Sequence, residues 1–262
     1  MAQWGSAGVI WIPITLLAAL IGLVAFILIR RSRPRGTEII FMVATQQTEL
    51  PQQDAVMQLM AERAILSPQY LLLFSDIRLN VGYWKRTRNK ALFHRDRLRE
   101  LAAGLDPDPQ FSEMLESAEA LITVSFSGKT KPDDRRYLAF VPALAVAYAA
   151  QVGATGVYDA FTARFFPAKE VVTMAKSGEL ESPEVQLALL QHPEGWETRG
   201  LCKVGISEVV FLGLDSKEKA DEAGEVLFRL AQLPNTLRVG NVTLTQIRKR
   251  PMPVYSLASG MG

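Results

Sequence analysis

The residues best suited to chemistry stand near two predicted strand ends. Some close segment 154–160 (ATGVYDA), and the others follow in segment 198–208, beside glycines that permit tight turns. Ligand crevices of α/β sheets form beyond the carboxyl ends of strands, so side chains from both segments could line one polar pocket. The candidate ligand-pocket residues are Tyr158, Asp159, Thr198, Arg199, Lys203 and Glu208.

A structural role is the alternative for these residues. Arg199 could form an ion pair with Asp159 or Glu208 that fixes a loop, because buried ion pairs also occur without catalysis. The chain has no serine-nucleophile elbow, histidine-based dyad or paired-histidine metal motif. The catalytic residues, and whether the protein is an enzyme, therefore stay open.

No metal or cofactor site is predicted. The single cysteine, Cys202, and the two histidines, His94 and His192, lack zinc-ligand spacing, although an all-carboxylate site stays open. Gly128-Lys129-Thr130 resembles the end of a phosphate-binding loop. The full motif needs a glycine five residues before Gly128, where the chain has Thr123, so we expect an ordinary strand-to-helix turn.

Hydrophobic periodicity predicts the elements that position these residues. The expected strands are 38–44, 70–74, 120–126, 154–160, 184–191 and 207–214, and a small hairpin is expected at 236–248. The expected helices are 54–66, 85–105, 111–118, 133–151 and 167–176, and one that Asp215 caps, while 161–166 and 195–203 are expected loops. Together they indicate one α/β (or α+β) mixed-sheet domain over 37–250, followed by a tail, 251–262. Strand 120–126, helix 133–151 and strand 154–160 suggest a parallel β-α-β unit.

Two helices carry an additional hypothesis. Residues 137–150 (YLAFVPALAVAYAA) are very apolar, but they are too few to span a membrane and Pro142 interrupts them, so a buried helix is expected. The stretch 85–105 is rich in Lys and Arg, with an apolar stripe formed by Ala91, Leu98, Leu101, Ala102 and Leu105. Its basic side could face anionic lipid or an acidic partner, or could simply be solvated.

Residues Gly8–Ile29 (GVIWIPITLLAALIGLVAFILI) are predicted to span a membrane. The run has no charged residue, and as a helix it would be ~33 Å long against a hydrocarbon core of ~30 Å. A cleavable signal peptide is the alternative, but Met1–Ala7 has no Lys or Arg and the run ends in arginines. These are Arg30, Arg31, Arg33 and Arg35, in a short linker, 30–36.

The arginines also predict the orientation and a lipid contact. Lys and Arg stay preferentially on the cytoplasmic side, so 1–7 should be outside the cell membrane and the domain in the cytoplasm.

Without those four arginines, 25 of the 29 basic residues remain against 27 acidic ones, a net charge of −2. A nearly neutral domain is not expected to bind nucleic acid. The single cysteine fits a reducing compartment.

Segment 196–233 resembles a known family. Thr198-Arg199-Gly200-Leu201, then Lys203-x-Gly205 and Glu208 at a strand entrance, is similar to the uncharacterised bacterial domain of unknown function 4261. That family often has an aromatic residue where this chain has Val204. The resemblance covers 38–247 loosely and implies a shared α/β fold but no activity.

The sequence therefore leaves two function classes. The first is a binding or scaffold module held under the membrane, with membrane lipid and a protein as partners, which the missing catalytic motifs favour. The second is a membrane-tethered hydrolase or transferase with a polar pocket near Asp159 and Arg199.

Overall fold

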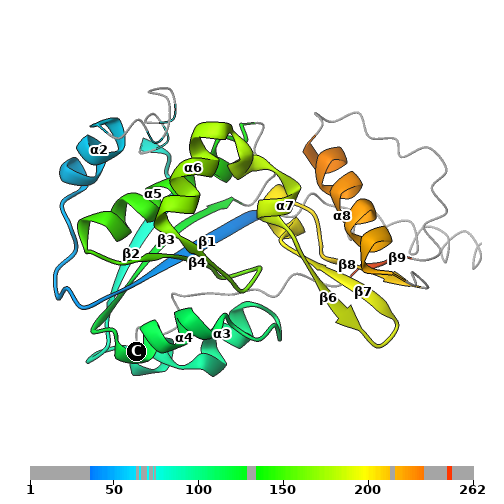
Figure 1. Cartoon of the computed structure of the whole chain (residues 1–262), viewed down its shortest axis with the longest axis horizontal. Helices are drawn as coiled ribbons and strands as arrows, with labels where there is room; N and C mark the ends of the chain where they lie inside the picture. The colour runs from blue at the N-terminus through cyan, green and yellow to red at the C-terminus, as the bar shows by residue number, and fades with distance from the viewer. Residues whose placement is uncertain are drawn as a thin grey trace, which may run out of the picture. The chain divides into compact units, whose positions relative to one another are not determined.

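The computed structural model describes residues 36–62, 65, 70, 73, 75–128, 134–212, 216–232 and 247–249. The predicted anchor Gly8–Ile29, its four arginines and the tail 251–262 lie outside these residues. Within the described ranges, no helix is long and apolar enough to cross a membrane. The domain contains two sheets with helices packed on them (Figure 1).

The first sheet has five strands in the order β2-β3-β1-β4-β5. Their bounds are β1 Thr37–Thr45, β2 Leu79–Lys85, β3 Ala120–Gly128, β4 Gly156–Asp159 and β5 Arg164–Pro167. Every pairing is antiparallel. Because β3 and β4 are each antiparallel to β1, they run parallel to one another with β1 between them.

The predicted β-α-β unit is therefore present, but it is split. The helix α5, Tyr137–Gln151, connects β3 to β4 across the central strand β1. With α2, Gln53–Glu62, between β1 and β2, the first four strands have the order of a ferredoxin-like β-α-β-β-α-β motif, with further helices inserted between β2 and β3. The expected mixed sheet was wrong for the described strands, whose pairings are all antiparallel, so the α+β alternative applies.

Strand β1 is apolar from position 39 to 44 because helices cover both faces of the sheet. Its side chains alternate between two cores, with Ile39, Phe41 and Val43 in one and Ile40 and Met42 in the other. The first core holds α2, α5 and α6, Ala168–Ser177. The second holds η2, Lys90–Phe93, with α3, Arg95–Leu101, and α4, Pro109–Ser117 (Figure 1).

Local sequence explains where several helices begin and end. Asp108 caps α4 by accepting hydrogen bonds from the backbone N–H groups of Gln110 and Phe111. Helix α6 ends at Gly178, whose positive φ of 79° suits a residue without a side chain. In α5 every residue except the last two is buried, which confirms the prediction of a buried helix.

The second sheet has the order β6-β7-β8-β9 and is also antiparallel. Its strands are β6 Ala188–His192, β7 Gly195–Arg199, β8 Val209–Leu212 and β9 Ile247–Lys249. The short helices η3 Glu179–Glu181, α7 Pro183–Gln186 and η4 Leu201–Val204 and the longer α8 Lys217–Gln232 complete this part. Helix η4 lies against β1, and α8 lies against β6 and β7.

Several predicted boundaries were wrong. Within 70–74, the described residues Tyr70 and Leu73 are helical, and the strand lies instead at β2. The predicted helix 85–105 is broken, because its start belongs to β2 and a turn precedes η2 and α3. Ala91 is exposed, although Leu98, Leu101 and Ala102 are buried.

The other wrong predictions of helices, strands and loops fall mostly in aromatic or polar segments. The expected loops 161–166 and 195–203 contain β5, β7 and η4, and the first part of 184–191 is α7. The predicted cap Asp215 lies outside the described residues, and at the start of α8 the Ser216 hydroxyl accepts a hydrogen bond from the Lys219 backbone N–H. The expected hairpin at 236–248 lies mostly outside the described residues, although β9 begins at Ile247.

The basic stretch is largely used by the fold. The Arg86 guanidinium donates to the backbone carbonyls of Ala118 and Glu116 at the end of α4 and lies over the Phe93 ring. Arg97 pairs with Glu100. Arg95 and Arg99 each approach Asp106 at 3.8 Å. These contacts favour the solvated or structural interpretation of 85–105.

The free energy of unfolding should depend on pH through the carboxyl group of Glu38. Burial in β1 raises the pKa of its carboxyl group to about 7. The ionised form therefore destabilises the fold, and this effect grows as pH rises from the unfolded pKa near 4.5 through 7. We expect Glu38→Gln to leave stability unchanged at pH 4 and to raise the free energy of unfolding by about 1–2 kcal/mol at pH 8, after allowance for partial exposure. Equal effects in urea unfolding at both pH values would contradict this assignment.

Candidate functional site

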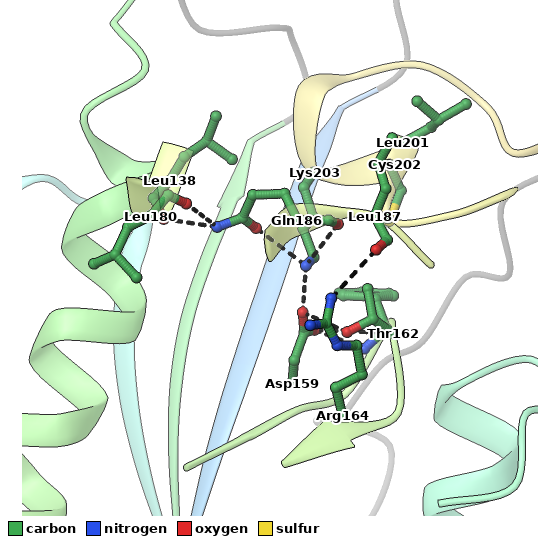
Figure 2. A network of polar contacts seen from close by, with 12 residues as sticks. Leu138, Asp159, Thr162, Arg164, Leu180, Gln186, Leu187, Leu201, Cys202 and Lys203 are labelled. Atoms are coloured by element: carbon green, nitrogen blue, oxygen red, sulfur yellow. Dashed lines mark hydrogen bonds and ion pairs between the residues drawn. The ribbon is translucent and has the colours of Figure 1, made fainter. Parts of the chain in front are cut away.

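Lys203 and Asp159 join the two sheets through a buried ion pair. The Lys203 ammonium on η4 donates to Oδ2 of Asp159 at the end of β4, and both side chains are 0% exposed (Figure 2). The Asp159 carboxylate also accepts from the Thr162 hydroxyl at 2.8 Å and the Phe161 backbone N–H at 3.0 Å. These donors together give the Asp159 carboxylate a structural role as a hydrogen-bond acceptor.

Gln186 completes the coordination of the Lys203 ammonium. Its backbone carbonyl and its side-chain oxygen accept from Lys203 Nζ at 3.0 and 3.1 Å. Its side-chain nitrogen donates to the carbonyls of Leu138 on α5 and Leu180 on η3 (Figure 2). Three separate segments therefore meet at one fully buried ammonium group.

Glu208 occupies a second buried polar cluster. Its carboxylate accepts from the backbone N–H groups of Gly200, Leu201 and Cys202, at 2.9, 3.3 and 3.2 Å. The Thr198 hydroxyl donates a further hydrogen bond at 2.9 Å. Burial raises the pKa of Glu208, and the hydrogen bonds to its carboxylate oppose that increase.

The position after Arg199 requires a glycine, which the sequence supplies as Gly200. Its φ is +106°, and a Cβ built there would lie 2.1 Å from the Gln186 carbonyl oxygen. The glycine lets the chain turn from β7 into η4, so that three consecutive N–H groups point at Glu208. The glycine, the glutamate and the lysine of this segment thus share one structural purpose, which is to shape and attach η4.

Arg199 forms an ion pair with neither of its predicted partners. It pairs with Glu197 on its own strand at 2.7 Å and donates to the Ala103 carbonyl after α3 at 3.0 Å. Its Nε is buried without a hydrogen-bond partner among the described residues. The predicted structural ion pair exists, but its partner is Glu197 rather than Asp159 or Glu208.

Tyr158 lies apart from the other candidates. Its ring stacks on Phe111 with centroids 4.3 Å apart, in the core formed with α3 and α4. Side chains of adjacent strand residues point to opposite faces, so Tyr158 and Asp159 face different cores. Burial raises the pKa of the Tyr158 phenol well above its ordinary value.

The six predicted residues consequently form no open pocket in the described structure. Asp159 meets Lys203, Thr198 meets Glu208, and Arg199 and Tyr158 have other neighbours. The most exposed of the six, Glu208, is only 7% exposed. A substrate could not reach these groups without separating the sheets, so the arrangement is suited to fixing one sheet on the other.

The sequence prediction missed three members of these clusters, Gln186, Thr162 and Glu197. The only local signal was Asp159 followed by Thr162, because an aspartate side chain commonly accepts from backbone N–H groups two or three residues on. Glu197 alternates with Arg199 along one strand, which becomes visible only when 195–199 is recognised as a strand. Gln186 had no signal, because its role depends on contacts distant in sequence.

Metal binding and known relatives give no further assignment. In the part of the chain that the structure describes, no group of three or more His, Cys, Asp or Glu residues is arranged to hold a metal ion. Compared with models of known families, with curated proteins and with solved structures, the chain matches none of them. The resemblance to domain of unknown function 4261 stays a prediction.

Proposed function

We propose that the chain is a single-pass, membrane-anchored binding or scaffold module with its domain in the cytoplasm. The carrying observation is that the polar residues most suited to chemistry are buried and occupied by internal partners. These buried groups stabilise the domain. Binding of a partner is therefore left to the outer surface of the domain. The uncharged run Gly8–Ile29 followed by four arginines supports the anchor and its direction.

The enzymatic alternative has less support. A hydrolase or transferase centred on Asp159 and Arg199 needs at least one of them to contact a substrate. Their side chains are 0% and 5% exposed and already bind Lys203 and Glu197. No specific observation favours catalysis at this position.

A substitution in the apolar run tests the anchor. We expect the full chain to stay in the membrane fraction through an alkaline wash. Replacing Leu20 and Leu23 with arginine should release most of it, because each arginine near the centre of a span opposes insertion by about 2.5–3.5 kcal/mol. The matched Leu20→Ala and Leu23→Ala double variant should remain in the membrane.

Protease accessibility then tests the direction. Protease added to intact cells should spare the domain and should digest it after the cells are opened. A mature protein that lacks Gly8–Ile29 would instead establish the signal-peptide alternative. Digestion of the domain in intact cells would overturn the cytoplasmic placement.

Binding is tested on the anchored protein. Full-length chain extracted in mild detergent should carry a partner in fixed ratio, and the two purified components should bind again after separation. Failure of every co-purified protein to bind again would contradict the binding-module proposal.

A further inference from the structure

Ile77 is a fully exposed apolar side chain at the tip of a turn. Its exposed fraction is 99%, the highest among the large apolar side chains of the described residues, where Val226 follows at 55%. The usual turn residues are glycine, proline, asparagine, aspartate and serine, each for a backbone reason that isoleucine does not share. The fold leaves this whole side chain in water, so its burial against apolar material would be favourable.

The turn holds Ile77 outward in a fixed position. The Leu79 backbone N–H donates to the Asp76 carbonyl at 2.9 Å, which closes the turn. The Arg78 backbone N–H donates to Asp76 Oδ1 at 2.9 Å, and the Arg78 guanidinium forms an ion pair with the same carboxylate at 2.6 Å. The guanidinium also lies over the Phe126 ring, 4.8 Å from its centre. Because the turn is already ordered, little conformational entropy would be lost when Ile77 makes a contact.

The register of the first sheet places this turn beside the start of β1. Phe126 of β3 is paired with Ile39 of β1 on one side and with Leu79 of β2 on the other. Since β1 and β2 are each antiparallel to β3, they run in the same direction, and Thr37 and Ile77 each come two residues before this shared row. Neighbouring strands are about 4.8 Å apart, so the turn and the start of β1 project from the same end of the sheet, about 10 Å from one another.

The start of β1 is also where the predicted anchor joins the domain. Only the linker 30–36 separates Ile29 from Thr37. At about 3.5 Å per residue, this linker reaches at most about 25 Å. The end of the sheet that carries Ile77 must therefore stay within that distance of the bilayer. The other end of β1 is a strand length further on, about 30 Å.

The basic stretch 85–105 begins at that other end of the sheet. Lys85, which is exposed, is paired with Ala120, and Ala120 is paired in turn with Thr45, the last residue of β1. A contact between this stretch and anionic lipid requires the domain to lie on its side or to turn over. The short linker therefore favours a lipid contact at the Ile77 end.

We propose that Ile77 inserts into the surface of the bilayer that residues 8–29 span, so that the Ile77 end of the sheet faces the membrane and the opposite end faces the cytoplasm. A single isoleucine would not hold a freely diffusing domain on a membrane. The linker keeps the domain at a high effective concentration beside the bilayer, so burial of one large apolar side chain raises the ratio of docked to undocked domain by roughly tenfold. The inference rests on the proposed anchor and names the lipid contact that orients the binding module.

Quenching of a fluorescent label by lipid measures this contact. Cys202, the one native cysteine, is only 3% exposed, so a cysteine introduced on the surface should take the label alone. The full chain is reconstituted in phosphatidylcholine vesicles whose acyl chains carry a nitroxide near the headgroup, and the vesicles are washed at alkaline pH before measurement. We expect a label at Asn80→Cys, exposed beside the turn, to be quenched. A label at Arg88→Cys, exposed at the opposite end of the sheet, should stay unquenched.

Ile77 supplies the matched variants, with the label kept at position 80. Ile77→Leu should preserve the quenching. Ile77→Asp should lower the ratio of docked to undocked domain at least about tenfold, because a carboxylate opposes insertion. Since the side chain at 77 is fully exposed, both variants should unfold at the same urea concentration as the native chain, which separates lost docking from a damaged fold. Quenching that survives Ile77→Asp would refute the proposal.

Lipid composition and the wash separate the remaining outcomes. Docking through Ile77 should occur in phosphatidylcholine alone and should resist salt. Quenching that requires phosphatidylserine, or that appears at the Arg88 label instead, would show that the basic stretch makes the lipid contact and would reject Ile77. An unquenched label at position 80, on chain that stays in the vesicles through the wash, would reject the docking and keep the anchor. Chain that leaves the vesicles in the wash would reject both.

Discussion

Replacing Lys203 with methionine should lower the free energy of unfolding by about 3–5 kcal/mol. Methionine fills similar volume but removes the only side-chain cation that contacts the Asp159 carboxylate in the described structure. It also leaves the carbonyl and side-chain oxygen of Gln186 without the ammonium that they share. The measurement is urea unfolding of the full chain in mild detergent, followed by tryptophan fluorescence.

A double-mutant cycle tests whether the loss comes from the unpaired charge. Asp159→Asn in the Lys203→Met background removes that charge, and the Asn side-chain oxygen can still accept from the Phe161 N–H. The double variant should be less destabilised than the sum of the single variants, by about 1–3 kcal/mol. Additive losses, or a loss below about 1 kcal/mol for Lys203→Met, would contradict a structural ion pair.

Local pattern predicted strands β1, β3 and β4 of the first sheet but missed β2 and β5. Strand β1 is mostly apolar, β3 alternates apolar with polar residues, and the helix α5 between β3 and β4 is apolar on nearly all sides. Strand β2 was missed since its sequence, LNVGYWK, places a glycine and polar ends in an edge strand. Strand β7 was missed because GWETR carries three polar residues that find partners only in the folded domain.

The sequence named the candidate residues as a possible ligand pocket but could not give their arrangement. In the described structure Asp159, Lys203 and Glu208 have internal hydrogen-bond partners. Their pairing depends on how the second sheet lies on the first, and no local spacing encodes that. Lys203 and Asp159 are separated by 44 positions, and Arg199 and Ala103 by 96. A pocket and a sealed ion pair need the same residue types, so the sequence alone could not distinguish them.

Glu208→Gln should be the second strongly destabilising change, although it keeps the size and shape of the side chain. Both carboxylate oxygens act as acceptors, one for Gly200 and Cys202 and the other for Leu201 and Thr198. An amide has only one oxygen, so its NH₂ group must face at least one backbone N–H. We expect a loss of about 3 kcal/mol, from hydrogen bonds to a charged acceptor and from a buried donor left without a partner.

Two comparisons isolate that effect. Glu222→Gln removes the same charge from an exposed position on α8 and should change stability by less than about 0.5 kcal/mol. Hydrogen exchange should then locate the damage, since Glu208→Gln should accelerate exchange of the amides of Gly200, Leu201 and Cys202 before those of β1. Uniform acceleration across both sheets would mean that Glu208 supports the whole domain rather than the turn between β7 and η4. If Glu208→Gln lowered the free energy of unfolding no more than Glu222→Gln does, the buried carboxylate would not be what holds η4 in place. The polar cluster would then be open to a role in binding or catalysis after all.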